Sequence, residues 1–146
     1  MLALNVDEAA AAAGTSVEEG QYSISGVVEA AVERLHGINP SLLVSITAGK
    51  NGSWSWDGNT LVHVPALAVD VVSTAGAGDA HLAGIIVGLV AGLTLPQAQE
   101  LGTLVAAHSV TSPHTIDKRI DREALRAFAE GNQVTVCDAV KDLLRE

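Results

Sequence analysis

Residues 73–79 read Ser-Thr-Ala-Gly-Ala-Gly-Asp, and an apolar helix is predicted to begin within them. The small side chains leave the backbone N–H groups of Gly76, Ala77 and Gly78 accessible, and the first N–H groups of a helix have no partner inside the helix. Together with the positive end of the helix dipole they form an anion site. A bound anion would repel Asp79, whose carboxylate is better placed to take a proton from a group attacking the anion. The stretch therefore predicts phosphoryl transfer to a hydroxyl, with Asp79 as base.

Two other polar segments follow predicted strands. Asn5 and Glu8 lie one helical turn apart after the short run at residues 2–4, where they can orient a phosphate or hold water on Mg²⁺. Thr47 opens the segment Thr-Ala-Gly-Lys-Asn-Gly at residues 47–52, which can present its hydroxyl and backbone N–H groups to a nucleotide. This segment is not a Walker A loop, because the spacing differs and Lys50 is not followed by Ser or Thr.

Each of the three segments also has a purely structural interpretation. Residues 73–79 can be a plain glycine turn with an aspartate at a helix start, and taken singly they leave the two interpretations open. Residues 5–8 can be an ordinary N-cap with an acid in the first turn, and residues 47–52 a strand-to-hairpin turn. For the last two, taken singly, the structural interpretation is the better one.

The hydrophobic pattern predicts alternating strands and helices, which is typical of an α/β fold. Strands are expected at residues 2–4, 42–47, 68–72 and 134–137, with a β-hairpin over 53–64. Helices are expected at residues 6–13, at 25–36 with Gly37 as the stop, at 77–93, after Thr94, at 121–130 and in the tail from 139. Gly84, Gly88 and Gly92 form a stripe that is expected to rest against a sheet.

Composition narrows the classes of partner. The 146 residues suffice for one domain, and the net charge of −9 excludes nucleic acid and anionic membranes, which need a basic face. A nucleotide remains compatible, because backbone N–H groups and Mg²⁺ can hold phosphates. Cys137 is the only cysteine, which fits a cytoplasmic protein. The uncharged run at residues 80–96 is shorter than the ~20 residues of a membrane helix.

Along the chain the three motifs come in the order 5–8, 47–52 and 73–79. In that order they resemble the motifs of the ribokinase-like, or PfkB, carbohydrate kinases. Members of that family carry Asn-x-x-Glu after a strand, then Thr-x-Gly-x-x-Gly, then Asp-Thr-x-Gly-Ala-Gly-Asp at the start of a helix. The resemblance covers nearly the whole chain. It implies a Rossmann-type three-layer fold with a mostly parallel sheet, a β-hairpin and flanking helices. It also implies ATP-dependent transfer of a phosphoryl group to a sugar or nucleoside hydroxyl.

The resemblance also implies roles for matching positions. Asp79 would deprotonate the acceptor hydroxyl, and the N–H groups of Gly76, Ala77 and Gly78 would stabilise the charge that develops on the phosphoryl group. Asn5 would help to place phosphate, and Glu8 would act on Mg²⁺ indirectly. The remaining contacts to ATP would come from Thr47, Gly49, Gly52, Thr74 and, near the adenine, Thr103.

The chain departs from the family pattern in three respects. Ser73 replaces the first Asp of the motif, an acid linked in many relatives to a monovalent-cation site, so the resemblance does not carry that cation over. His81 stands where an aromatic residue is usual. The family domain is also much longer, so residues 1–146 would be one partial domain, the ATP-side C-terminal half. Such a half would expose a sheet edge and an apolar sheet face. We therefore expect a homo-oligomer or a missing N-terminal half.

Overall fold

The computed structural model describes residues 1–15, 23–113 and 120–145. The chain divides into two compact units, Met1–Pro65 and Ala66–Glu146. Each unit has its own cluster of buried apolar side chains, so each is built around its own core.

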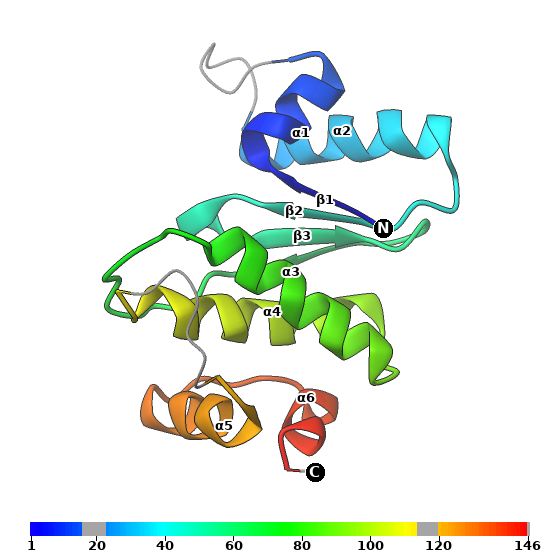
Figure 1. Cartoon of the computed structure of the whole chain (residues 1–146). Coiled ribbons are helices and arrows are strands. Elements are labelled where there is room, and N and C mark those ends of the chain that lie inside the picture. Colours follow the sequence, from blue (N-terminus) through cyan, green and yellow to red (C-terminus); the bar gives the residue numbers. More distant parts are fainter. Residues whose placement is uncertain (16–22, 114–119, 146) are drawn as a thin grey trace. The chain divides into compact units, whose positions relative to one another are not determined.

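The first unit is a four-stranded sheet with two helices (Figure 1). Its elements are β1 (Leu2–Asn5), α1 (Val6–Ala13), α2 (Ile24–Ile38), β2 (Val44–Thr47), the 3₁₀ turn η1 (Gly49–Asn51), β3 (Ser53–Trp56) and β4 (Leu61–Val64). The strand order is β1-β2-β3-β4. Strand β1 is parallel to β2, whereas β2–β3 and β3–β4 are antiparallel. The expectation of a mostly parallel sheet is therefore wrong, because the hairpin contributes two antiparallel pairs.

The two faces of this sheet differ in chemistry. Leu4, Ile46 and Trp54 lie in register on one face and pack into the core formed with α1 and α2. That core includes Val28, which is fully buried. The opposite face carries small and polar residues, such as Ser45 in the central strand β2, together with Val62 and Val64 of the edge strand β4. The apolar face of the sheet is thus covered within the unit, in contrast to the exposed apolar face that was expected.

The ends of α1 and α2 follow from local sequence. Helix α1 ends at Gly14, whose φ of +74° is the left-handed conformation that glycine adopts readily. Helix α2 continues through Gly37 to Ile38, with Asn39 as its C-cap, so the expected stop at Gly37 is wrong. The physical reason is Pro40, which disfavours helical backbone at the residue before it.

The second unit is helical among the residues described (Figure 1). Its elements are α3 (Ala77–Val90), α4 (Leu95–Val110), α5 (Arg122–Gly131) and α6 (Asp138–Leu143). Helices α3 and α4 form a hairpin through Gly92, where φ is +88°. Thr94 caps α4 as expected, and its backbone N–H donates to Gln97 Oε1 at 2.9 Å. Helices α5 and α6 pack against α4 around Leu104 and Val140, both fully buried.

Glycines bring α3 and α4 unusually close together. A Cβ atom built on Gly84 would lie 2.6 Å from the Cα of Gly102, and one on Gly88 would lie 2.9 Å from the Cα of Ala98. Real Cβ atoms are not found at such distances. Two of the three glycines in the predicted stripe therefore face a neighbouring helix, whereas Gly92 lies in the turn beyond α3.

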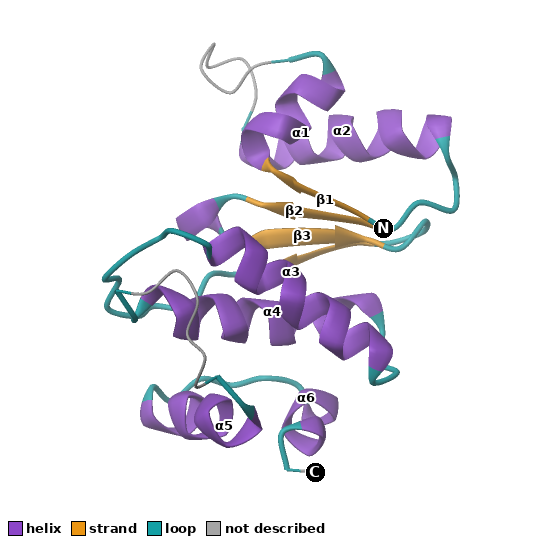
Figure 2. Cartoon of the chain, in the orientation of Figure 1, coloured by secondary structure: helices purple, strands orange, loops and turns teal. Residues whose placement is uncertain are grey.

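The strands expected at residues 68–72 and 134–137 are loops (Figure 2). Three backbone N–H groups of these segments have acceptors outside any sheet. Val72 N–H donates to Val110 O at 2.8 Å, and Val134 N–H donates to Ala129 O at the end of α5. Cys137 N–H donates to Glu100 Oε2 at 2.7 Å.

Within the described part of the chain, no helix has the length and apolar character needed to cross a lipid bilayer.

Candidate functional site

The first motif lies where β1 ends and α1 begins. Asn5 Oδ1 accepts from Glu8 N–H at 2.9 Å, and Glu8 Oε2 accepts from Asn5 N–H at 2.8 Å. This reciprocal pair is a capping box, so the structural interpretation of the motif describes its geometry. Both residues are exposed, and each keeps one polar side-chain atom, Asn5 Nδ2 and Glu8 Oε1, outside these two bonds.

The second motif lies beside the first. Asn5 and Thr47 are direct neighbours in the parallel β1–β2 pair, each at the carboxyl end of its strand. Thr47 Oγ1 also donates to the backbone oxygen of Leu4 at 3.4 Å. In open α/β sheets, ligands bind outside the carboxyl ends of parallel strands. The two motifs therefore meet at the kind of edge where a nucleotide can bind.

The turn after β2 is held by its own backbone. Ala48 N–H donates to Gly52 O at 2.9 Å, and Asn51 N–H donates to Ala48 O at 3.0 Å. Gly52 N–H donates to Gly49 O at 3.1 Å. Both glycines have positive φ, +53° at Gly49 and +87° at Gly52, which explains why this motif needs glycine at these two positions. Among the described residues, the turn amides without an acceptor are those of Gly49 and Lys50, and these are the ones it can offer to a ligand.

The third motif forms the start of α3. Gly76 is the N-cap, with a φ of +79°, and Ala77, Gly78 and Asp79 are the first three helical residues. Ala77 N–H donates to Thr74 O at 3.2 Å, which leaves the amides of Gly76, Gly78 and Asp79 without an acceptor in the described part of the chain. The amide of Asp79 thus joins the donors predicted from sequence, while that of Ala77 already has a partner.

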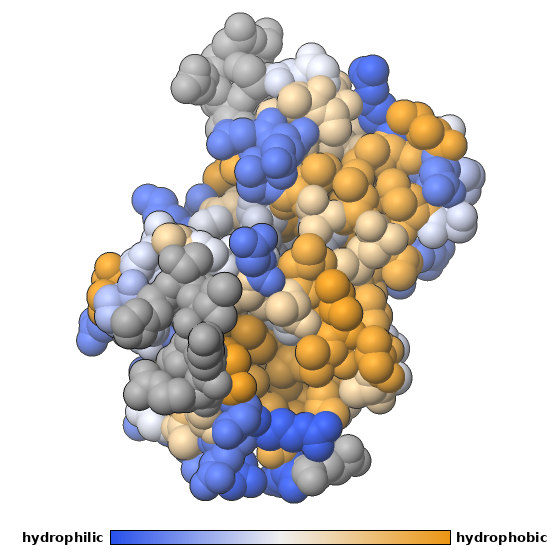
Figure 3. Space-filling view, in the orientation of Figure 1, coloured by the Kyte–Doolittle hydropathy of each residue, from blue (hydrophilic) through white to orange (hydrophobic). Residues whose placement is uncertain are grey.

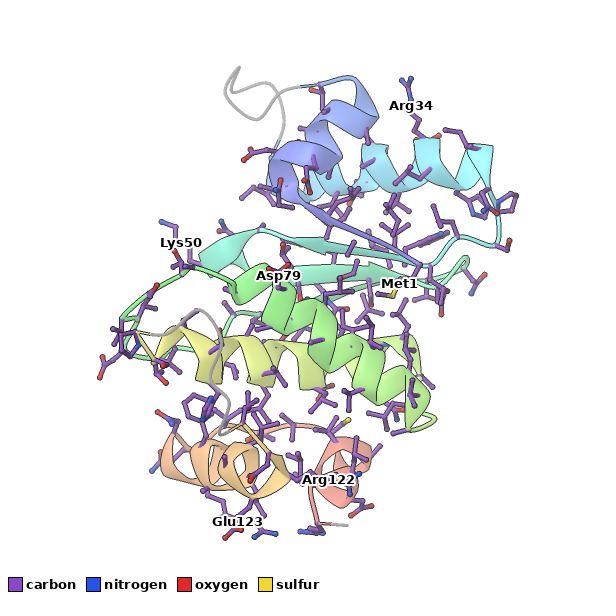
Figure 4. All side chains as sticks on the ribbon, viewed as in Figure 1. Met1, Arg34, Lys50, Asp79, Arg122 and Glu123 are labelled. Carbon is purple, nitrogen blue, oxygen red and sulfur yellow. The ribbon has the colours of Figure 1, made fainter. Side chains whose placement is uncertain are left out.

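Asp79 lies on the exposed side of this helix start (Figure 4). Its carboxylate does not cap the helix, and no other described residue forms a hydrogen bond or ion pair with it. Gly78, directly before it, is equally open, because a Cβ built there would meet no atom within 4 Å. Both residues at this helix start are therefore accessible from outside.

The segment leading into this motif is anchored to the end of α4. The backbone oxygen of Val110 accepts from Val72 N–H at 2.8 Å and from Ser73 N–H at 3.1 Å. The Ser73 hydroxyl in turn accepts from Ala75 N–H at 3.3 Å. The side chain of Ser73, which replaces the family's aspartate, thus forms a hydrogen bond with the backbone of its own loop.

Thr103 and His81 are buried side chains on α4 and α3. Among the described residues, Thr103 Oγ1 and His81 Nε2 have no hydrogen-bond partner. Burial lowers the pKa of His81 to about 4, so the imidazole is neutral at pH 7. Thr103 lies seven residues before Val110, or about 10 Å along the helix axis, and so is away from the end of α4 that holds the loop.

Apart from Thr103, which lies within α4, the predicted site residues thus fall into two groups, each described within its own unit. Asn5, Glu8, Thr47, Gly49 and Gly52 gather at the carboxyl ends of β1 and β2. The start of α3 gathers Thr74, Gly76, Ala77, Gly78 and Asp79.

No three His, Cys, Asp or Glu side chains converge on a metal site within residues 1–15, 23–113 and 120–145. Mg²⁺ usually takes only one or two carboxylates and keeps water and substrate phosphates as its other ligands. Glu8, exposed and with one carboxylate oxygen outside the capping box, fits such a role.

Hydrogen bonds at two places that hold the site segments were not predicted from the sequence. One is the pair of hydrogen bonds at Val110, and the other is a hydrogen bond from His63 Nε2 to Asn51 O at 2.8 Å. Both use a backbone carbonyl as acceptor, which every residue provides, so no residue type marks them in the sequence.

The chain is similar to curated kinases of sugars and related compounds, but it matches only part of the length of each. Fructoselysine 6-kinase of Escherichia coli (strain K12) is 45% identical over 67 residues, which are 46% of this chain and 26% of the relative. The 2-dehydro-3-deoxygluconokinase of Bacillus subtilis (strain 168) is 35% identical over 86 residues, which are 58% of this chain and 26% of the relative. The chain therefore spans about a quarter of the length of these relatives.

Solved structures of similar fold are also longer. The ribokinase of Arabidopsis thaliana, complexed with ribose and ATP, superposes with a TM-score of 0.73 at 21% identity, over 87% of this chain and 40% of that one. Adenosine kinase from Sinorhizobium meliloti gives a TM-score of 0.67 at 26% identity, over 89% of this chain and 36% of that one. The fold is thus an α/β fragment of the ribokinase-like type. The model of the pfkB family of carbohydrate kinases matches residues 1–122, and the chain belongs to this family.

Proposed function

We propose that this chain is the nucleotide-binding part of an ATP-dependent kinase that phosphorylates a sugar or nucleoside hydroxyl. The observation that carries the proposal is the placement of Asn5 and Thr47 side by side at the carboxyl ends of parallel strands. The family match and the sugar kinases among the relatives support the same reaction class. The activity of a whole kinase remains part of the proposal, because the chain spans a minor share of its relatives.

In the proposed reaction, Asp79 accepts the proton of the acceptor hydroxyl while the oxygen of that hydroxyl attacks the γ-phosphorus of ATP. The new O–P bond forms as the bond to the β-phosphate oxygen breaks, and ADP leaves. The amides of Gly76, Gly78 and Asp79 would donate to the oxygens on which charge develops. If bound, Mg²⁺ would supply positive charge that offsets the charge of the phosphates, and Glu8 would hold it through water.

The ATP contacts of Thr47, Gly49, Gly52, Thr74 and Thr103 belong to the same proposal. At the turn, the Gly49 and Lys50 amides are the available donors. The buried hydroxyl of Thr103 has no partner among described residues, which is compatible with a ligand nearby. Its distance from Val110 makes Thr103 the member of this set that is least supported by geometry.

Asp79→Asn is the direct test. The variant should lose turnover by about 10²–10⁴-fold while the dissociation constant of Mg-ATP stays within a few fold, because the amide keeps the shape of the carboxylate but cannot take a proton. Turnover is measured by coupled assay with fructose 6-phosphate, 2-dehydro-3-deoxygluconate, ribose and adenosine, and binding by calorimetry. Asp70→Asn, an exposed site with no assigned role, is the matched control. Equal loss of binding and turnover in Asp79→Asn would contradict the role of base.

A second candidate is a module that binds nucleotide, or only assembles, without turnover. It is favoured by the share of the solved kinases that the chain covers, 36% to 41%. Binding of Mg-ATP without turnover on any of the four acceptors would support nucleotide binding alone. Absence of any shift in melting temperature with Mg-ATP would support an assembling fragment.

A further inference from the structure

The turn that follows β2 is braced from outside by the β3–β4 hairpin. His63 on β4 places Nε2 at 2.8 Å from the backbone oxygen of Asn51, the last residue of η1. A carbonyl oxygen can only accept, so Nε2 of His63 carries the hydrogen and donates it. The bond spans twelve residues, and it is a contact to the turn that is additional to the turn's own backbone bonds.

The ring of His63 is itself held in place. His63 and Trp54 face each other across the β3–β4 pair, and their ring centroids lie 4.3 Å apart with an angle of 28° between the planes. Such a stack limits the rotation of the imidazole and keeps Nε2 directed at the turn. Trp54 in turn packs against the core of the first unit, so the turn is linked to a rigid element.

The other hydrogen bonds of the turn are local: they are its own backbone bonds and one from Asn51 Nδ2–H to Ala48 O at 3.4 Å. Its residues Gly49, Lys50 and Asn51 are exposed, and two glycines, Gly49 and Gly52, reduce its stiffness. Lys50 lies on this turn (Figure 4). The amides of Gly49 and Lys50, those left for a ligand, point correctly only if the turn keeps its conformation.

We propose that His63 is a positioning residue, which holds the Gly49–Asn51 turn through its Nε2–H so that the Gly49 and Lys50 amides are set for a nucleotide phosphate or ribose. The brace itself rests on the geometry of β3 and β4. Its effect on a nucleotide rests on the proposed function.

Two substitutions separate the hydrogen bond from the stack. His63→Phe keeps an aromatic ring against Trp54 but has no donor. His63→Gln loses the ring but places an amide N–H near the position of Nε2. The first readout needs no ligand. Hydrogen exchange of the bonded turn amides, those of Ala48, Asn51 and Gly52, should speed up by about 2- to 12-fold in His63→Phe, as expected for one lost hydrogen bond, and stay near wild type in His63→Gln. Amides of α2, such as those of Val28 and Ala31, serve as the internal control.

The second readout is the dissociation constant for Mg-ATP, by calorimetry on the full chain. It should rise by about 2- to 12-fold in His63→Phe and return close to wild type in His63→Gln. Faster exchange throughout the first unit would overturn the proposal, because it would mean general destabilisation. Faster exchange confined to residues 48–52 with unchanged affinity would overturn the positioning role. If wild type does not bind Mg-ATP at all, the proposed function fails, and the exchange data still decide whether His63 holds the turn.

Discussion

Gly76 and Gly78 stand two residues apart at the start of α3, yet the structure requires glycine only at the first. Gly76 has a φ of +79°, which other residues adopt at a cost of about 1–2 kcal/mol. Gly78 has helical backbone and open space around a built Cβ, so the protein itself gives no reason for glycine there. A ligand that approaches the helix start closely would give one.

Gly78→Ala tests that reason. Alanine is the better helix former, so the variant should be as stable as wild type or more stable by up to about 1 kcal/mol. Its affinity for Mg-ATP or its turnover should nevertheless fall at least tenfold, because a methyl group fills the space above the helix start. Thermal melts and calorimetry measure the two effects. Gly76→Ala is the control that should lose stability, and full function in Gly78→Ala would show that the space is not used.

His81 makes stability depend on pH. Its pKa is about 4 in the folded chain, against 6.5 for a free histidine. Between these values the unfolded chain binds a proton that the folded chain does not, so stability falls as the pH decreases from 6.5 to 4. The loss amounts to at most about 3 kcal/mol. His81→Phe should remove this part of the pH dependence, as measured by urea unfolding at pH 7, 5.5 and 4.5. Identical slopes in variant and wild type would contradict the assignment.

At the residue level, the sequence predicts the site better where the motif is local. The positions of Asn5, Glu8, Thr47 and Gly76 follow from short patterns at strand and helix ends, and the structure places them there. Which backbone amides are available to a ligand could not be predicted, because the sequence does not show that Ala77 N–H donates to Thr74 O. Contacts such as that of His63 depend on the register of distant strands.

At the level of elements, the hairpin of α3 and α4 depends on a close approach at Gly102. A Cβ on this residue would lie 2.6 Å from the backbone oxygen of His81 and 2.9 Å from Ile85 Cγ1. The helices would have to separate to accept it. Small-to-large changes in such packing cost about 1–3 kcal/mol.

Gly102→Ala should therefore destabilise the chain by about 1–3 kcal/mol in urea unfolding. Gly37→Ala is a matched control, since Gly37 also lies inside a helix but has no atom within 4 Å of a built Cβ. This control should gain up to about 1 kcal/mol from helix propensity. Equal effects of the two substitutions would show that the close approach does not limit α3–α4 packing.

Helices and the hairpin could be predicted because their signals are periodic and local. Caps at Asn5, Thr94 and Asp121 start helices where expected. The two strands that were predicted wrongly, at residues 68–72 and 134–137, are short apolar runs, which do not reveal whether a neighbouring strand exists. Their amides found acceptors in α4 and α5 instead.

At the level of the whole molecule, apolar surface remains exposed. Figure 3 shows hydrophobic atoms gathered over α3, whose Ile86, Val87 and Val90 are 50%, 57% and 84% exposed. In the sheet, β1 has no neighbour on its outer edge among the described strands. Helices that are apolar all round are normally buried, so these surfaces favour association with another chain or segment.

We expect the chain to self-associate, with Val90→Lys shifting it toward the monomer. A charge at an apolar contact would lose its hydration on association, which makes association unfavourable. Sedimentation velocity over a concentration series measures the shift, and Ala127→Lys on the exposed side of α5 is the control. A wild-type chain that stays monomeric at every concentration would contradict the expectation.

The two hydrogen bonds at Val110 O connect the end of α4 to the segment just before α3. These bonds tie the start of α3, which has 14 residues, to the end of α4, which has 16. The lengths of the two helices are therefore coupled. An insertion or deletion in one helix would move Val110 relative to Val72 unless the other helix changed with it. A change in the length of α3 should thus be tolerated only together with a matching change in α4.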